Sequence, residues 1–437
     1  MPNRLNRPSH CGSDAIDAAG CIEASAAEND GIRNKNRRQK RDARLRQYDR
    51  AEIMLDANNY VYAFNKSRLD TSWKASIQKY EAYLLRNIYQ TIESVKNGDN
   101  LSLGFIEFEL CERGHRRDIR SVHIKERVPQ RLISDKVLIP VLSNSLIYDN
   151  GASLKDKGLH FSLNRLVAQL QKYHRSKNKD PNGYVSGRDP SGYILQIDFR
   201  HFFDSIPHKE VYRMLEEKFK DPTIRRIMHQ LVDAFGPERS LGIGSQVSQI
   251  LAVSFPNSVD HNIKEKLGIK FYGRYMDDLY LIHEDKEYLK KCLEGIRIEA
   301  AKIGLEINDR KTHISRIDRW FTFLKFKFKL EPTGKVAIRP SRDNIVRERR
   351  KLKKLQLKVE AGEIPFGAVE QQYESFKAHL SFASCRRTVR HMDRLFNDLY
   401  IKEWRKPYGR KKDNRTPEGR HSDRRFRQHP KPDSNVR

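Results

Sequence analysis

The 437-residue chain carries 85 Lys and Arg residues against 57 Asp and Glu, which gives a formal net charge of +28. Such an excess favours a polyanionic partner, with nucleic acid first and an acidic membrane surface second. No apolar run approaches the roughly 20 residues of a membrane span, the N-terminus lacks a signal-peptide core, and the five cysteines show no C-x-x-C spacing. We therefore expect a soluble, cytoplasmic chain without a disulfide framework or a zinc site.

The N-terminal third of the chain predicts an arm, a helix, a hairpin and a helix pair. Residues 1–52 are small and polar, then strongly basic, and without a sustained apolar period they predict a disordered arm. Apolar residues at three-to-four spacing predict one amphipathic helix over 70–96. Residues 102–124 alternate apolar and polar and predict paired strands with a basic turn at 113–117. Residues 140–174 predict a helix, a polar loop and a second helix.

Two strand patterns in the middle of the chain bring acidic residues together. "YILQIDF", residues 193–199, is a short, nearly continuous apolar strand in which Asp198 comes near the end. "KFYGRYMDDLYLIH", residues 270–283, predicts a hairpin with Met276 and Asp277 at its tip. Neighbouring strands lie about 4.8 Å apart. If the two elements pair, Asp198 and Asp277 therefore face each other across one ligand-sized gap.

Adjacent carboxylates in a half-buried hairpin indicate a metal site. Close carboxylates repel each other unless a cation lies between them, and oxygen-only ligands suit Mg²⁺. Two such ions about 3.5 to 4 Å apart would stabilise the attacking and leaving oxygens of a phosphoryl transfer. The alternative is an ordinary turn, because Asp is common in turns and a Tyr-x-Asp-Asp string arises by chance in roughly one chain in twenty of this length.

The C-terminal hundred residues predict helices followed by a tail. Residues 347–363 and 373–404 have helical periodicity and many basic side chains. The closing residues are basic, interrupted by prolines and without a core of their own. Both basic ends of the chain are expected to strengthen salt-sensitive binding to phosphate backbones, or else to be solvated extensions.

Several of these segments carry a family resemblance. In order and spacing, five of them resemble the palm motifs of reverse transcriptases: "LQIDFRHFFDSIPH", "LGIGSQVSQILAVSFPN", "YGRYMDDLYLIH", "GLEINDRKTHIS" and "FTFLKFKFKL". The upstream stretch 116–142 resembles the finger motifs of the bacterial, group II intron-like branch. The resemblance implies an α+β, right-hand polymerase fold. It divides the chain into a basic arm, fingers, a palm with an antiparallel sheet, a helical thumb and a basic tail, at residues 1–52, 53–192, 193–330, 331–402 and 403–437.

The resemblance also implies a catalytic set. Asp198 and Asp277 correspond to the two metal-binding aspartates, and Asp278 to their less strictly required neighbour. The backbone carbonyl of Phe199 corresponds to the main-chain metal ligand, so the expected cofactor is a pair of Mg²⁺ ions, with Mn²⁺ as the alternative. Lys311 corresponds to the lysine near the pyrophosphate leaving group and is a candidate general acid, with an ordinary surface lysine as the alternative.

Nucleotide-binding residues are implied in the fingers and at the start of the palm. Arg117 corresponds to the finger arginine that binds the incoming triphosphate. Phe203 falls where the family keeps an aromatic ring that clashes with a 2′-hydroxyl, or else it is a core residue. Lys125 and Arg127 are basic candidates for the nucleotide, for template phosphates or for a solvated surface.

The second palm motif departs from the common pattern. Most relatives read Gln-Gly-x-x-x-Ser-Pro, whereas this chain has Ile243 before the glycine and Gln249 in place of proline. Gly244 and Gln249 are predicted to contact the nucleotide. Similar changes occur in diversity-generating retroelements, which copy adenines inaccurately, and in bacterial defence-associated reverse transcriptases. The motif therefore puts the fidelity of copying in question.

The expected function is RNA-directed DNA polymerisation. The partners implied are the DNA product, deoxynucleotides and an RNA template, which is most simply a dedicated non-coding RNA. An accessory protein or an oligomer is a further option, and no membrane is expected. Bacterial anti-phage defence is the preferred setting. The alternatives are a mutagenic retroelement enzyme and a catalytically idle RNA-binding scaffold, although a scaffold gains nothing from repelling carboxylates.

Overall fold

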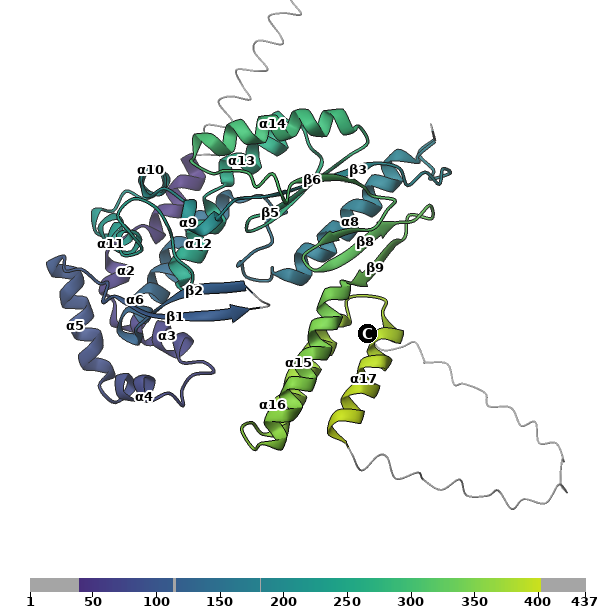
Figure 1. Ribbon diagram of the computed structural model, residues 1–437. Helices are drawn as coiled ribbons and strands as arrows, with labels where there is room; N and C mark the ends of the chain where they lie inside the picture. Colours follow the sequence, from purple (N-terminus) through teal and green to yellow (C-terminus); the bar gives the residue numbers. More distant parts are fainter. Residues whose placement is uncertain (1–38, 113–114, 181, 402–437) are drawn as a thin grey trace, which may run out of the picture. The chain divides into compact units, whose positions relative to one another are not determined.

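The computed structural model describes residues 39–112, 115–180 and 182–401 (Figure 1). The chain divides into two compact units, one of Met1–Ile345 with Ser381–Ser384 and one of Val346–Leu380 with Cys385–Arg437. Most of the predicted basic arm and tail lies outside the described residues. Within the described part, no helix is both long and apolar enough to cross a membrane.

The first unit begins with helices. The predicted disorder of the arm is wrong for its last residues: 39–45 are helical, and the N–H of Ala51 donates to the Asp221 carboxylate at 2.8 Å, which ties the end of the arm to the folded unit. One helix over residues 70–96 is a wrong prediction, because the segment forms two helices that part at Tyr83. There the side-chain amide of the buried Asn87 donates to the carbonyl of Tyr80 and replaces a helical hydrogen bond. The elements are η1 (Arg46–Tyr48), α2 (Glu52–Leu55), α3 (Ala57–Ser67), α4 (Ala75–Ala82) and α5 (Leu84–Asn97).

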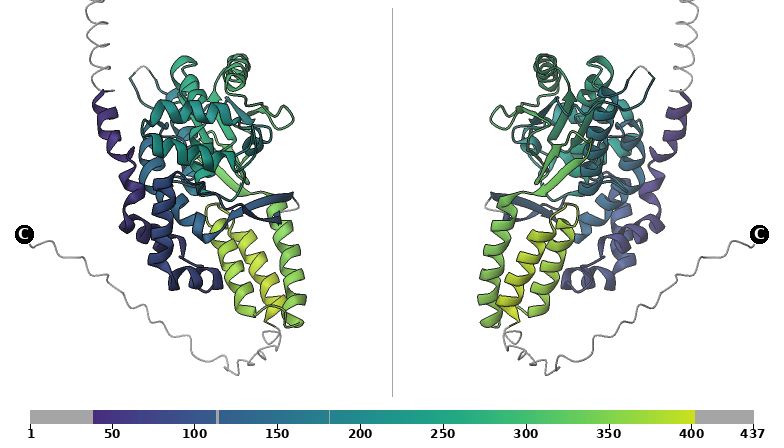
Figure 2. Two further views of the ribbon diagram at one scale, coloured as in Figure 1. Left: turned by 90° about the vertical axis from the view of Figure 1, so that its left-hand side faces the viewer. Right: turned by 90° about the vertical axis from the view of Figure 1, so that its right-hand side faces the viewer.

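The predicted paired strands are confirmed. β1 (Phe105–Glu112) and β2 (His115–Val122) form a two-stranded antiparallel ribbon (Figure 2). Phe105 lies opposite Val122. The central turn residues 113 and 114 lie outside the described part of the chain. The predicted helix, loop and helix over 140–174 are also confirmed. The elements after β2 are α6 (Ile124–Ile133), η2 (Ser134–Leu138), α7 (Ile139–Leu142), η3 (Ser143–Ser145) and α8 (Leu159–Lys177).

A four-stranded antiparallel sheet in the order β4-β5-β3-β6 forms the centre of the first unit. The predicted apolar strand is β3 (Tyr193–Asp198), which is buried from Ile194 onward, and the predicted hairpin is β4 (Phe271–Tyr275) with β5 (Asp278–His283). The remaining strand is β6 (His313–Arg316). Helices around the sheet are α9 (Phe202–Ser205), α10 (His208–Lys218), α11 (Pro222–Asp233), α12 (Gln246–Ser254), α13 (Asn257–His261), η4 (Asn262–Lys266) and α14 (Lys286–Lys302).

A second antiparallel sheet follows in the order β7-β8-β9. β7 (Phe321–Phe323) and β8 (Phe326–Leu330) bury alternate residues, as the pattern predicts for a half-buried hairpin. Leu324 and Lys325 both have positive φ, which is the geometry of the hairpin turn that matches the twist of its strands. β9 (Val336–Pro340) completes the sheet.

The second unit consists of helices, as the periodicity predicts, but the stretch 373–404 is not continuously helical, because a turn at residues 381–385 interrupts it. α15 (Arg342–Glu360) begins just before it, and α16 (Phe366–Leu380) and α17 (Arg386–Tyr400) lie beside α15 in both figures. The rings of Tyr373 and Phe396 stack at 4.4 Å, and the hydroxyl of Tyr400 donates to the carbonyl of Leu352. These contacts give the unit a small aromatic core of its own.

Candidate active site

Strand pairing gathers three carboxylates at one end of the central sheet. β3 and β5 run antiparallel with Asp198 directly opposite Asp278. The pairing of the two elements is thus as expected, while the residue opposite Asp198 is Asp278 and Asp277 lies next to it in the β4–β5 turn. Met276, the first residue of that turn, has a φ of 55°. Residues other than glycine rarely adopt this backbone conformation outside functional sites and tight turns.

The loop before β6 contributes two partners to Asp198. The buried carboxylate of Asp198 accepts hydrogen bonds from the Lys311 ammonium at 3.0 Å and from the Asn308 side-chain amide at 2.9 Å. The backbone N–H of Asn308 also donates to the carbonyl of Asp198 at 2.8 Å, which fixes the loop against the end of β3. The hydrogen bond to Asp198 raises the pKa of Lys311, so its ammonium stays charged at neutral pH.

The carboxylate cluster is electrostatically under-compensated. Burial raises the pKa of Asp278 to about 7, and the charges of Asp277 and Asp198 add to the rise while Lys311 opposes it. Among the charges that act on Asp278, the two neighbouring carboxylates therefore outweigh the Lys311 ammonium. A cation bound between the carboxylates would relieve this excess of negative charge.

The donor set suits hard divalent cations. The carboxylate oxygens of Asp198, Asp277 and Asp278, with the carbonyl of Phe199, are the oxygen ligands that Mg²⁺ and Mn²⁺ prefer. The chain at Phe199 is held by flanking hydrogen bonds, one of them from the N–H of Arg200 to the carbonyl of Glu306 at 2.8 Å. Among the described residues, no group of three His, Cys, Asp or Glu side chains is already arranged to hold a metal ion.

The raised pKa of Asp278 makes a prediction about metal-free protein. Its carboxyl ionises near 3.8 in the unfolded chain and at about 7 in the folded one. The free energy of unfolding is therefore expected to fall as the pH rises from about 4 to about 7 and to stay low above. Asp278→Asn is expected to remove this slope and to raise the unfolding midpoint at pH 8. Urea unfolding in EDTA across this range measures it, and an unchanged slope would contradict it.

A buried ion pair holds the carboxylate turn in place. Arg274 of β4 and Asp260 of α13 are both completely buried, and two guanidinium nitrogens donate to the Asp260 carboxylate at 2.7 and 2.8 Å. A third nitrogen of Arg274 donates to the carbonyl of Met276 at 3.1 Å. Sequence reasoning missed this role, although a charged residue within an apolar strand already requires a buried partner.

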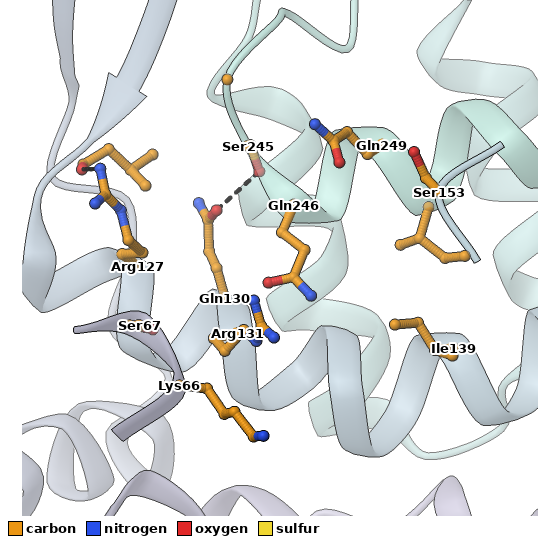
Figure 3. Close-up of a pocket in the computed structure, with 13 residues that line it drawn as sticks. Lys66, Ser67, Arg127, Gln130, Arg131, Ile139, Ser153, Ser245, Gln246 and Gln249 are labelled. Atoms are coloured by element: carbon orange, nitrogen blue, oxygen red, sulfur yellow. Dashed lines mark hydrogen bonds between the residues drawn. The ribbon is translucent and has the colours of Figure 1, made fainter. Parts of the chain in front are cut away.

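A pocket of about 410 Å³ collects part of the predicted nucleotide-binding set (Figure 3). Gly244 and Gln249 line it together with the basic residues Lys66, Arg127 and Arg131. Figure 3 shows the side chain of Lys66 on α3, those of Arg127 and Arg131 on α6 and that of Gln249 at the start of α12. The pocket thus combines positive charge with the second palm motif.

Two contacts fix the loop that carries Gly244. A Cβ added to Gly244 would lie 2.6 Å from the carbonyl oxygen of Arg120, so only glycine allows this approach to β2. The neighbouring Ser245 hydroxyl donates to the Gln130 side chain at 2.8 Å, and Gln130 donates in turn to Glu126 at 2.8 Å. Sequence reasoning missed Gln130, which supports the loop from inside the core.

Three further predicted residues lie elsewhere. Lys125 lines a different pocket, of about 610 Å³, between α4, α5 and the start of α6. Arg117 lies in β2 opposite Leu110, and its side chain is outside what the structure describes. Phe203 is half-buried in α9, with its ring edge-on to Phe202 at 5.6 Å. The structure therefore does not gather the whole predicted nucleotide set into one pocket.

Comparison with known proteins points to the same chemistry. Residues 125–334 match the family model described as reverse transcriptase (RNA-dependent DNA polymerase). No curated protein matches the sequence.

Solved structures with similarity include two telomerases. Apo telomerase from Candida tropicalis, truncated from its C-terminal domain, is 14% identical with a TM-score of 0.40, over 54% of this chain and 55% of that one. Telomerase from Candida albicans, in complex with a TWJ fragment of telomeric RNA, is 14% identical with a TM-score of 0.42, over 73% and 60%. The chain thus spans less than two thirds of the length of either telomerase.

The predicted fold class is confirmed. The described chain combines helices with antiparallel sheets. Strand β3 and the β4–β5 hairpin, which carry the aspartates, fall within the matched segment. Residues 125–334 therefore match a reverse transcriptase domain, which is a nucleotidyltransferase domain, and the chain has the right-hand polymerase fold.

Proposed function

We propose that this chain is an RNA-directed DNA polymerase that extends a 3′-hydroxyl with deoxynucleotides on an RNA template. One observation carries the proposal: β3 and β5 set Asp198 opposite Asp278, beside Asp277, within a reverse transcriptase domain. A pair of bound Mg²⁺ ions would supply charge neutralisation at the attacking and leaving oxygens of the phosphoryl transfer. Asp198, Asp277, Asp278 and the carbonyl of Phe199 would hold them.

The other residues bind and orient the substrate. Lys311 carries its proton on Nζ at neutral pH and would donate it to the departing pyrophosphate. The basic pocket with Gly244 and Gln249 would receive the nucleotide, and Arg117 would bind its triphosphate. Lys125 lines a separate pocket and would contact a template phosphate rather than the nucleotide.

Primer extension by the full chain tests the proposal. A DNA primer annealed to an RNA template, with deoxynucleotides and Mg²⁺ or Mn²⁺, is expected to be extended to the template end, and EDTA is expected to stop the reaction. Absence of incorporation with either metal on RNA templates of several sequences would overturn the proposal and favour an idle RNA-binding scaffold. The raised pKa of Asp278 speaks against a scaffold, since it marks a charged cluster that costs stability in metal-free protein.

Phe203 is the proposed sugar discriminator, and its replacement gives a selective prediction. Phe203→Ala is expected to raise the efficiency of ribonucleotide over deoxynucleotide incorporation by roughly tenfold to a hundredfold, because space opens for a 2′-hydroxyl. Phe202→Leu is the matched control, since Phe202 is buried and should lower stability without changing the ratio. Steady-state kcat/KM values for both nucleotide types measure the effect. An unchanged ratio in Phe203→Ala would make Phe203 a core residue only.

The biological setting is proposed from sequence motifs. The second palm motif and the finger motifs favour a cytoplasmic, group II intron-like enzyme that copies a non-coding RNA in bacterial anti-phage defence. Sequencing of RNA and new DNA recovered with the tagged chain tests this. Products with errors concentrated at template adenines would favour the retroelement alternative instead.

A further inference from the structure

A second basic pocket lies at the end of β3 that is opposite to Asp198. It has a volume of about 620 Å³ and is formed by the last turns of α8, the loop that precedes β3 and the β8–β9 turn. We call it the strand-start pocket and define it by Arg175, Val185, Ser186, Arg188, Thr333 and Gly334. β3 runs from Tyr193 to Asp198, and five steps of about 3.3 Å place roughly 16 Å of strand between this pocket and the carboxylates.

The walls of the strand-start pocket are fixed by hydrogen bonds. The buried Asn178 side chain donates to the carbonyl of Asp189 and accepts from its N–H, both at 2.8 Å, which closes the loop. A Cβ on Gly187 would lie 2.4 Å from the Asn178 oxygen, so the loop backbone runs directly over this side chain. On the other wall, Nε2 of the buried His174 donates to the carbonyl of Pro332 at 3.1 Å. The pocket is therefore formed before any ligand binds.

The charges that face this pocket are uncompensated. Among the described residues, no acidic side chain lines it and neither Arg175 nor Arg188 takes part in an ion pair. Lys177 nearby is different, because it pairs with Asp189 at 2.9 Å. Two exposed guanidinium groups beside the hydroxyls of Ser186 and Thr333 suit phosphate oxygens.

An exposed aromatic residue, Tyr184, directly precedes Val185, which lines the pocket. Tyr184 is 75% exposed, although its backbone is fixed: its N–H donates to the Asp180 carboxylate and its carbonyl accepts from the Asp180 N–H, both at 2.8 Å. A nucleobase can stack on an exposed ring that a fixed backbone presents. Proteins bind single-stranded nucleic acid through such rings together with positively charged side chains.

We propose that the strand-start pocket binds an unpaired segment of RNA, with phosphates on Arg175 and Arg188 and a base on Tyr184. The inference rests on the proposed function only in taking RNA as the ligand. It adds a contact point that is separate from the catalytic carboxylates and serves to hold the RNA rather than to copy it.

Fluorescence anisotropy on the full chain tests the proposal. The probe is a labelled 12-nucleotide oligouridylate, and an excess of unlabelled blunt RNA–DNA duplex occupies the duplex-binding surface. Arg175→Gln with Arg188→Gln is expected to weaken binding about tenfold and to reduce the slope of log K against log salt by about 1.4, the value for two phosphate contacts on a single strand. Tyr184→Ala is expected to weaken binding about tenfold without changing the slope.

A charge-matched control separates specific contacts from net charge. Arg213 is paired with Glu210 on α10, and Arg297 with Glu294 on α14 and with Asp309 in the loop before β6. Their joint replacement by Gln removes the same two charges. Equal binding by the two double variants would overturn the proposal. So would displacement of the probe by uridine monophosphate or inorganic phosphate at a concentration equal to that of the nucleotide units in the oligomer. Primer extension on a short pre-annealed template is expected to be unchanged, which distinguishes failure of this site from failure of the polymerase.

Discussion

Asp198→Asn is expected to reduce nucleotide incorporation by about 10³-fold or more while the chain stays folded. Electrostatic stabilisation is usually the largest part of catalysis, and this side chain supplies a buried negative charge to the cluster. Asn keeps the size of the side chain and an oxygen that can still accept from Asn308. Loss of the charge also removes the ion pair with Lys311. Single-turnover primer extension at saturating Mg²⁺ measures the effect.

Asp204→Asn is the matched control for this substitution. Asp204 is an exposed carboxylate on α9, a few residues after Asp198 in the chain, so its change alters net charge equally. The control is expected to keep activity within about twofold, as is usual for surface positions away from a site. Comparable activity in Asp198→Asn and the control would contradict the assignment of the carboxylate cluster as the catalytic centre.

Arg274→Met is expected to lower the free energy of unfolding by about 3 to 5 kcal/mol, because it leaves the Asp260 carboxylate buried without its counter-charge. Arg274 also fixes the Met276 carbonyl, so the variant is expected to lose activity as well. Urea unfolding and primer extension measure the two effects.

The double variant Arg274→Met with Asp260→Asn separates stability from catalysis. It removes both buried charges and leaves an oxygen to accept the hydrogen bond from the Tyr272 hydroxyl. Most of the lost stability is expected to return. Activity is expected to stay low, since the hydrogen bond to Met276 is still missing. Full recovery of activity together with stability would show that Arg274 serves the fold alone.

The hairpin that carries Asp277 and Asp278 could be predicted from sequence because its signals are local. The apolar run before Asp198 and the two runs around Met276 and Asp277 each specify a strand or a turn within a few residues, and the structure confirms the pairing. The exact partner of Asp198 was not predictable from the pattern. Register depends on how both strands pack, and it makes Asp278 the facing residue.

Prediction from sequence failed where a particular side-chain contact, rather than the apolar pattern, determines the structure. The break at Tyr83 depends on the side chain of Asn87, which competes for a backbone carbonyl and leaves no mark on the apolar period. The partnership of Arg274 and Asp260 joins a strand to a helix, and Gln130 supports Ser245 across more than a hundred residues of sequence. The last two contacts belong to the tertiary structure, so a pattern of neighbouring residues does not reveal them.

The close contact between Gly244 and β2 has a mechanical consequence. The N–H of Arg120 donates to the carbonyl of Ile243 at 3.0 Å, and its guanidinium donates to the carbonyl of Phe235 at 2.7 Å. Hydrogen bonds thus hold the ribbon β1–β2 directly against the loop of the second palm motif. We therefore expect that a ligand that shifts the loop also shifts the ribbon, because the two are in direct contact although helices separate them in sequence.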